Sequence, residues 1–273
     1  MLRSAVLAGR LGRCVPRPQR PLMVSSVLIS RSVLAGCSGE NRTGVEQARQ
    51  FGEDQVVPNA QIGIPVPRVK AVILDAFGTV LKIHKGCHPY RQVLKIGRLR
   101  GRGVRADDAK IIMTNPLSLE AAAAHFGIAL LPSELERIQA ELDSELQRIE
   151  PYEDALLAIE ALQSAGIKVA ICSNLALPYR EPIERLFPGL DGYGYSFEVG
   201  ALKPDTRIYR YVIDQLGVAA HETWMIGDSQ QCDRDGPTKF GIKGHYLDRC
   251  HTRTEGFAEL RSFIRVVLNS NKS

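Results

Sequence analysis

Short apolar runs alternate with segments of helical periodicity along the chain from residue 69 onward. Residues 69–74 are apolar at nearly every position, which is typical of a parallel strand covered on both faces. Later runs of the same character predict strands at 167–172, 195–199, 223–226 and 242–247. Apolar residues at intervals of three and four predict helices at 151–165, 177–187, 204–216, 233–240 and 257–268. This alternation predicts an α/β fold, a doubly wound three-layer parallel sheet with right-handed crossovers.

The pattern also divides the chain into parts. Residues 81–150 contain no strand-like run and show helical spacing, most clearly at 117–126 and 132–149. Residues before the first strand show no sustained period. We therefore expect a disordered leader and linker at 1–66. The core would consist of two pieces, 67–80 and 151–273, and a helical cap at 81–150 would be inserted between them.

The charge of the chain is concentrated near its start. The formal net charge is +5, but residues 1–39 hold six arginines and no acidic residue, which leaves 29 basic and 30 acidic residues elsewhere. A nearly neutral folded part gives no indication of a nucleic-acid partner. No apolar run approaches the roughly 18 residues of a membrane span. The six cysteines form no Cys-x-x-Cys pair, as expected in a reducing compartment.

The leader at 1–66 has more than one explanation. Its Arg-rich, acid-poor start resembles a mitochondrial transit peptide, which would place the protein in the mitochondrial matrix. A start codon assigned too far upstream, or a disordered tail, explains the same composition, and the protein would then be cytoplasmic. Residues 34–37 also look like a lipoprotein cleavage box, although Arg31 interrupts the apolar stretch before it.

Polar side chains stand where three of the predicted strands end. Asp75, Ser173 and Asp228 each lie at or just past the end of an apolar run. The carboxyl ends of parallel strands meet at one edge of a sheet, where α/β proteins bind ligands. A carboxylate at the end of a buried strand is costly to keep charged unless it takes part in chemistry. We therefore expect these three side chains to lie together in a functional site.

Four motifs follow one another in order along the chain. They are Asp75-Ala76-Phe77-Gly78-Thr79, Ile171-Cys172-Ser173-Asn174, Lys203-Pro204-Asp205, and Gly227-Asp228 with Asp233 five residues later. Together they resemble the motifs of the haloacid dehalogenase-like (HAD) hydrolase superfamily. The resemblance covers residues 69–250 and places the helical insert where that superfamily carries its C1-type cap.

The resemblance implies hydrolysis through a covalent aspartyl intermediate. Asp75 would be the nucleophile, and water would later hydrolyse the intermediate. Lys203 would supply positive charge to the transferring oxygens, and Ser173 would donate a hydrogen bond to them. The resemblance also implies Mg²⁺, which prefers oxygen ligands and would be held by Asp75, the backbone carbonyl of Phe77 and Asp228.

Three further residues complete the implied site. Asp233 would take part in catalysis by orienting Lys203 or metal-bound water. Asn174 and Thr79 would contact substrate, and Thr79 would also fix the turn after the nucleophile by local hydrogen bonds. Simpler roles stay open, because Ser173 and Asn174 can be ordinary turn formers. Asp233 can equally be an acidic residue at a helix N-terminus.

Two positions point to different reactions. Phosphatases of the superfamily usually carry a second Asp two residues after the nucleophile, where it protonates the leaving alcohol. Phe77 occupies that position here, as an aromatic residue does in the 2-haloacid dehalogenase branch, whose halide leaves without a proton. Asp228 is the metal-binding form, whereas the dehalogenases have a small hydroxyl residue there. We give Asp228 more weight, because without a cation it would repel Asp75.

The predicted cap offers a substitute for the missing acid. His84 and His88 follow the first motif closely, and a histidine pKa suits proton transfer near neutrality, although such histidines are more often structural or exposed. With Cys87 they form an incomplete zinc set. The basic run that includes Lys95 and Arg98 would draw an anionic substrate to the cap or form a solvated loop.

The function that these observations favour is Mg²⁺-dependent hydrolysis of a small, anionic, phosphorylated metabolite. The missing acid predicts slow turnover or substrates with good leaving groups. One alternative is dehalogenation of a short 2-haloacid. Another is a weakly active or inactive family member that binds a phosphorylated ligand or partner. The substrate and the oligomeric state stay open.

Overall fold

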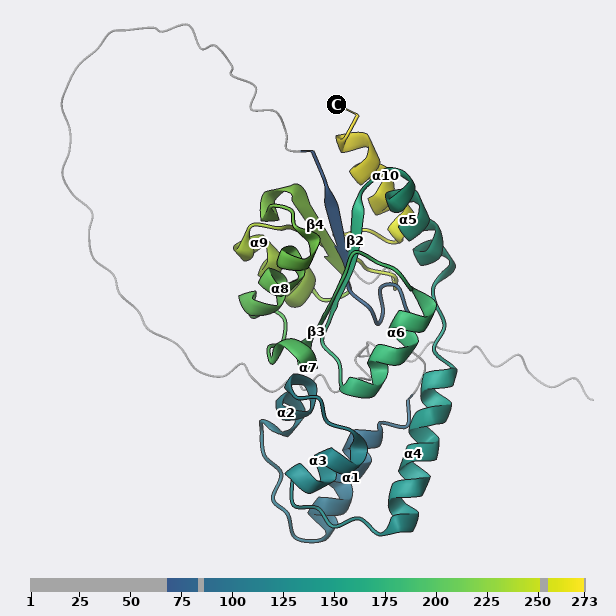
Figure 1. Cartoon of the computed structure of the whole chain (residues 1–273), viewed down its shortest axis with the longest axis vertical. Helices are drawn as coiled ribbons and strands as arrows, with labels where there is room; N and C mark the ends of the chain where they lie inside the picture. The colour runs from purple at the N-terminus through teal and green to yellow at the C-terminus, as the bar shows by residue number, and fades with distance from the viewer. Residues whose placement is uncertain (1–67, 83–85, 251–254, 273) are drawn as a thin grey trace, which may run out of the picture.

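The core of the protein is a single parallel sheet. The computed structural model describes residues 68–82, 86–250 and 255–272. Its five strands lie in the order β3-β2-β1-β4-β5 (Figure 1). They are β1 (Ala71–Leu74), β2 (Lys168–Ser173), β3 (Gly192–Tyr195), β4 (Thr223–Gly227) and β5 (Lys243–Tyr246). Every neighbouring pair is parallel, which confirms the predicted doubly wound sheet.

The alternation of side chains along β1 explains why helices cover both faces of the sheet. Val72 and Leu74 lie in one apolar cluster with residues of α5, α6 and α10, whereas Ala71 and Ile73 lie in a second cluster with residues of α8. All four side chains are fully buried. The outer helices are α5 (Glu153–Ser164), α6 (Arg180–Leu186), α8 (Thr206–Leu216), α9 (Gly236–Phe240) and α10 (Leu260–Ser270). Of the helices described, none is both long enough and apolar enough to span a bilayer.

Four of the five described helices between β1 and β2 in sequence gather at one end of the sheet, shown in blue and teal in Figure 1. They are α1 (Pro89–Leu99), α2 (Asp108–Thr114), α3 (Leu119–His125) and α4 (Pro132–Gln147). The buried Ser196 hydroxyl, just after β3, donates to the Met113 carbonyl of α2 at 2.7 Å. The insert therefore meets the core beside the carboxyl end of a strand. The leader predicted at 1–66 lies outside the described residues.

The predicted strand at 195–199 was wrong. The strand is Gly192–Tyr195, and the residues after it form the short helix α7 (Ser196–Val199). Two glycines obscured the strand, because glycine has a low strand propensity and adds nothing to an apolar pattern. A Cβ at Gly194 would overlap the Val212 side chain of α8, so the glycine allows this helix to pack closely on the sheet.

The interpretation of the basic run as a solvated loop was wrong for its first part. Lys95 and Arg98 lie on the exposed side of α1. Farther along, Arg102 pairs with the buried Asp108 at 2.6 Å, and its guanidinium lies 4.6 Å from the ring centre of Phe126. This part of the run holds the insert together.

A partly buried histidine lies in an aromatic cluster at the edge of the sheet. The ring of His245 in β5 lies 4.9 Å from Trp224, 5.2 Å from Phe263 and 5.6 Å from Phe257, measured between ring centres. Its Nε2 is buried and has no hydrogen-bond partner among the described residues. Burial, and secondarily the charge of Lys243, lowers the pKa of His245 from 6.5 to about 4.

We expect His245 to make the fold less stable in acid. Since its pKa is lower in the folded than in the unfolded chain, its contribution is complete above pH 6.5 and is lost as the pH falls toward 4. Urea unfolding at pH 7.5, 5.5 and 4.5 measures this effect. The free energy of unfolding should fall less between pH 7.5 and pH 4.5 in His245→Phe than in the wild type. His221→Gln, at an exposed position, is the control and should follow the wild type. The same pH dependence in all three proteins would contradict this role.

Candidate active site

Three neighbouring strands bring the predicted residues to one edge of the sheet. Asp75 follows β1, Ser173 ends β2 and Asp228 follows β4. The strands β2, β1 and β4 are adjacent and in register, with Leu74 opposite both Ile171 and Ile226. Asp75 and Ser173 are buried, and Asp228 is partly buried. The expectation that the strand ends converge is thus met.

Lys203 is the positive centre of this edge. Its ammonium donates to Asp75 Oδ1 at 2.7 Å, to Asp233 Oδ1 at 2.7 Å and to the carbonyl of Cys172 at 2.8 Å. These three hydrogen bonds use all three ammonium protons. The residue is only 5% exposed, so a charge here requires such partners. The lysine is therefore locked between two carboxylates rather than solvated in a loop.

Burial and charge shift several pKa values in this cluster. Burial favours a neutral Lys203, but the charges of Asp233 and Asp75 outweigh burial and raise its pKa well above the ordinary value. Burial raises the pKa of Asp233 to about 6, although Lys203 opposes that change. Burial and then the charges of Asp75 and Asp233 raise the pKa of Asp228 well above its usual range. The lysine is therefore charged, and Asp228 lacks an adequate counter-charge.

Asp233 is held by the turn that follows β4. Residues Gln230–Asp235 form a π-helical turn, which replaces the start of the helix predicted at 233–240. Asp233 Oδ2 accepts a hydrogen bond from the Ser229 amide at 2.9 Å. The Tyr209 hydroxyl of α8 donates to the Cys232 carbonyl at 2.5 Å and braces the same turn. Asp233 is therefore fixed with one oxygen toward Lys203, as one of its predicted roles requires.

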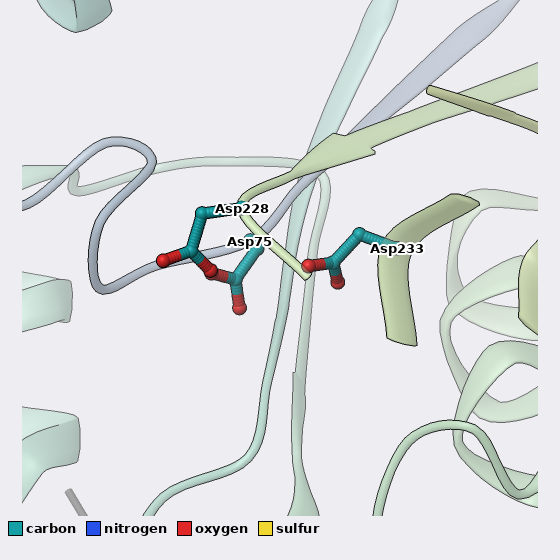
Figure 2. Close-up of side chains that lie close together, drawn as sticks. All are labelled: Asp75, Asp228 and Asp233. Atoms are coloured by element: carbon teal, nitrogen blue, oxygen red, sulfur yellow. The ribbon is translucent and has the colours of Figure 1, made fainter. Parts of the chain in front are cut away.

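The three carboxylates form a cluster suited to a cation. One oxygen each from Asp75, Asp228 and Asp233 lies within 4.8 Å of the others (Figure 2). When ionised, these groups carry three negative charges against the single positive charge of Lys203. All of the donors are carboxylate oxygens, which divalent Mg²⁺ prefers. The side chains present therefore fit a divalent cation in both charge and donor type.

Asn174 and Thr79 make positioning contacts within the site. The Asn174 side chain accepts from the Lys203 amide at 2.7 Å and donates to the Lys203 carbonyl at 3.1 Å. The buried Thr79 hydroxyl donates to Asp75 Oδ2 at 3.3 Å. These bonds orient the lysine and the first aspartate. The contacts with substrate that we predicted for Asn174 and Thr79, and for Ser173, stay predictions.

Phe77 lies where the insert meets the core. Its ring makes an edge-to-face contact with Tyr179 at 5.7 Å between centres. The Tyr179 hydroxyl donates to Glu145 of α4 at 2.9 Å, and Glu145 also accepts from the Cys87 amide at 2.9 Å. Glu145 and Tyr179 could not be found from the sequence, because neither belongs to a motif. Of the two histidines considered as substitute acids, His84 lies outside the described residues and His88 precedes α1.

Cys87 does not behave as a metal ligand in this arrangement. Its Sγ lies 2.9 Å from a Glu145 carboxylate oxygen, to which it donates. Burial and then this carboxylate raise the pKa of the thiol to about 12, so it stays protonated at neutral pH. The thiol therefore serves to hold the start of the insert against α4.

Gly227 gives the site the space that it needs. A Cβ at this position would overlap the carboxyl group of Asp233 and lie 2.7 Å from the Cβ of Asp75. We expect Gly227→Ala to cost about 1–3 kcal/mol of unfolding free energy by overpacking. It should also lower turnover by about 100-fold, because both acids move. Urea unfolding and steady-state kinetics measure these effects.

Gly103→Ala is the matched control for this substitution. No atom lies within 4 Å of a Cβ built at Gly103, and its backbone suits any residue. It should match the wild type in both measurements. Wild-type turnover in Gly227→Ala would mean that the spacing of Asp75 and Asp233 is not critical.

Comparison with known proteins gives the family. The family model described as haloacid dehalogenase-like hydrolase matches residues 69–237, which is more than half of the chain. The chain belongs to this family of hydrolases. Among solved structures, it is similar to the HAD phosphatase from Thermococcus onnurineus, with a TM-score of 0.53 and 22% identity. That similarity covers 75% of this chain and 100% of the other, and at this identity it concerns the fold.

Among the curated relatives are one named as a dehalogenase and one named as a phosphatase. The chain is 27% identical over 199 residues to (S)-2-haloacid dehalogenase 4A of Burkholderia cepacia, which covers 67% of this chain and 85% of the relative. It is 29% identical over 109 residues to phosphoserine phosphatase of Thermus thermophilus, which covers 38% of this chain and 43% of the relative. The family therefore does not decide between phosphate and halide release.

Proposed function

We propose that this protein is a metal-dependent phosphohydrolase that acts on a small phosphorylated metabolite. The observation that carries the proposal is Asp228, placed with Asp75 and Asp233 in a cluster that has one lysine for three carboxylates. A metal-free dehalogenase has no use for a second, poorly compensated carboxylate beside its nucleophile. Asp75, Asp228 and the Phe77 carbonyl would hold Mg²⁺, which would screen the carboxylates and offset charge on the phosphoryl group.

The residues would then divide the reaction between them. An Asp75 oxygen attacks phosphorus, and the bond to the leaving oxygen breaks with its electron pair on that oxygen. Water then cleaves the aspartyl phosphate, which releases inorganic phosphate and restores the carboxylate. Ser173 donates a hydrogen bond to a phosphoryl oxygen, Lys203 supplies positive charge beside the phosphoryl group, and Asp233 keeps Lys203 charged and oriented. Asn174 and Thr79 contribute polar contacts around the same group.

Phe77 shapes the choice of substrate in this proposal. A phenyl ring cannot protonate a leaving alkoxide, so substrates whose leaving group is already a stable anion are favoured. Acyl phosphates and aryl phosphates meet this condition, and simple alkyl phosphates do not. The helical insert at 81–150 would act as the cap that recognises the rest of the substrate, because it meets the core beside Phe77 through Glu145 and Tyr179.

A second candidate is dehalogenation of a short 2-haloacid. Phe77 favours it, since a halide leaves without a proton. The Burkholderia cepacia relative, of which the alignment covers 85%, is named as such an enzyme. A third candidate is a family member that binds a phosphorylated ligand without turning it over.

Substrate turnover by the full chain separates these candidates. Acetyl phosphate, p-nitrophenyl phosphate and 2-chloropropionate would each be assayed with Mg²⁺ and with EDTA. We expect phosphate release that EDTA abolishes and that is fastest for the acyl phosphate. Chloride release that EDTA does not change would instead establish the dehalogenase. Phosphate binding without release from any substrate would favour the third candidate.

A further inference from the structure

An arginine outside the four motifs lies behind the turn that carries Thr79. Arg249, after β5, makes a two-pronged ion pair with Asp154 in the first turn of α5, at 2.9 and 3.1 Å. The side chains are only 15% and 14% exposed. A paired, two-pronged contact at this depth is far more ordered than an ordinary surface ion pair.

The same guanidinium also holds the backbone of the turn. Arg249 Nη2 donates to the carbonyl of Thr79 at 2.7 Å, and Nε donates to it at 3.2 Å. The guanidinium carbon lies 3.9 Å from the ring centre of Tyr152. A planar, five-donor guanidinium can serve a carboxylate and a carbonyl at once while stacking on a ring, and a lysine cannot.

This contact is made with Thr79, which is also the hydrogen-bond partner of the nucleophile. The Thr79 hydroxyl donates to Asp75 Oδ2, while its carbonyl is held from behind by Arg249. Gly78, at φ 84°, passes so close to Asp228 that a Cβ would overlap its carboxylate. A shift of the Thr79 carbonyl would therefore move the contacts of both aspartates.

Arg249, Asp154 and the Thr79 carbonyl together form a clamp behind the turn. Asp154 connects this clamp to the rest of the core. Its Oδ2 also accepts the Leu260 amide at the start of α10, at 2.9 Å. The Tyr152 amide donates to the Val80 carbonyl at 2.9 Å, next to the turn. Segments that are far apart in sequence thus meet behind the Asp75 turn.

We propose that Arg249 is a positioning residue for the reaction, which holds the Thr79 carbonyl so that Asp75 keeps its orientation for attack. The inference rests on the proposed function. Arg249 does not touch the reacting atoms, so its loss should affect kcat and leave KM nearly unchanged.

The insert contains a matched control for Arg249. Arg100 Nη2 donates to both carboxylate oxygens of Glu134, at 2.8 and 2.9 Å, and Nη1 donates to the backbone carbonyl of Ala129. The kinds of partner are the same, a carboxylate and a backbone carbonyl, but this pair is more exposed, joins the end of α1 to the start of α4 and involves no motif residue.

The test compares Arg249→Lys, Arg249→Ala and Arg100→Ala with the wild type, all as full chains, using acetyl phosphate and Mg²⁺. Both Arg249 variants should lose about 10- to 100-fold in kcat, with KM within about twofold, because small misplacements of a reacting group are costly. Methylguanidinium in solution should restore part of the rate to Arg249→Ala. Arg100→Ala should match the wild type. Wild-type kcat in Arg249→Lys, or an equal loss in Arg100→Ala, would overturn the inference.

Hydrogen exchange separates failure of this inference from failure of the proposed function. The amides of Gly78, Thr79 and Val80 are hydrogen-bonded within the turn. They should exchange faster in Arg249→Lys than in the wild type or in Arg100→Ala, whatever substrate the enzyme uses. If the wild type turns over no substrate but these amides exchange faster in Arg249→Lys, the proposed function is rejected and the clamp is retained. Unchanged exchange in Arg249→Lys would reject the clamp by itself.

Discussion

Asp75→Asn is expected to lower turnover by about 10⁴-fold or more, the largest effect of any single substitution in this chain. An amide cannot attack phosphorus or form the aspartyl intermediate, so the covalent route is lost. The fold should survive, because Lys203 keeps Asp233 and the Cys172 carbonyl as partners. Phosphate release from acetyl phosphate with Mg²⁺ measures the effect, and thermal unfolding checks the fold.

A control and a binding measurement make this result decisive. Asp143→Asn changes an exposed acid on α4 in the same way and should retain the wild-type rate. Calorimetric binding of inorganic phosphate to Asp75→Asn would show that the site still forms. A rate that is unaffected by Asp75→Asn would reject the nucleophile assignment and with it the aspartyl mechanism.

The positions of Asp75, Ser173 and Asp228 could be predicted because two strong signals coincide there. Each residue is polar at or just past the end of an apolar run, and neighbouring parallel strands end at the same edge. Lys203 is different. Its burial follows from contacts with two acids, the nearer of which in sequence is 30 residues away. Lys203 could be assigned to the site only because the segment Lys203-Pro204-Asp205 resembles a family motif.

The sequence could not assign partners to side chains with several possible uses. The contact of Asn174 with substrate stays a prediction, but its hydrogen bonds with the Lys203 backbone could not be predicted, because an amide that can reach a ligand can equally reach a backbone. Arg249 has no local signal, since its partners lie 95 and 170 residues away. The missed strand Gly192–Tyr195 has a comparable cause, because the space that its glycines leave for α8 is a property of the packed fold.

Asp228→Asn is expected to abolish the dependence on Mg²⁺ and to make the metal-free protein more stable. Without a cation, Asp228 adds a negative charge next to Asp75 and Asp233, and one lysine serves all three. Asparagine cannot ionise, so the substitution removes the cost of keeping Asp228 charged, or of protonating it, beside two carboxylates within 4.8 Å. This should raise the free energy of unfolding by on the order of 1–3 kcal/mol at neutral pH. Urea unfolding in EDTA measures this gain.

The same substitution should nearly eliminate phosphate release. Metal binding is worth several kcal/mol in phosphoryl transfer, so kcat/KM with Mg²⁺ should fall by about 100- to 1,000-fold. Added Mg²⁺ should raise the unfolding temperature of the wild type and leave that of Asp228→Asn unchanged. Asp235→Asn is the control, because Asp235 lies seven residues farther along the same segment, pairs with Arg234 and is not part of the cluster.

These two effects have opposite signs, and that opposition is what identifies a metal site. A carboxylate that only supports the fold would lower stability when it is neutralised, and one that is merely exposed would change nothing. Higher stability in EDTA together with lost Mg²⁺ response and lost turnover requires a charge that is kept for a cation at a cost to the fold. If Asp228→Asn is less stable in EDTA and still releases phosphate with Mg²⁺, then Asp228 is structural. Phe77 then becomes the better guide to the reaction, and halide release is the reaction to measure next.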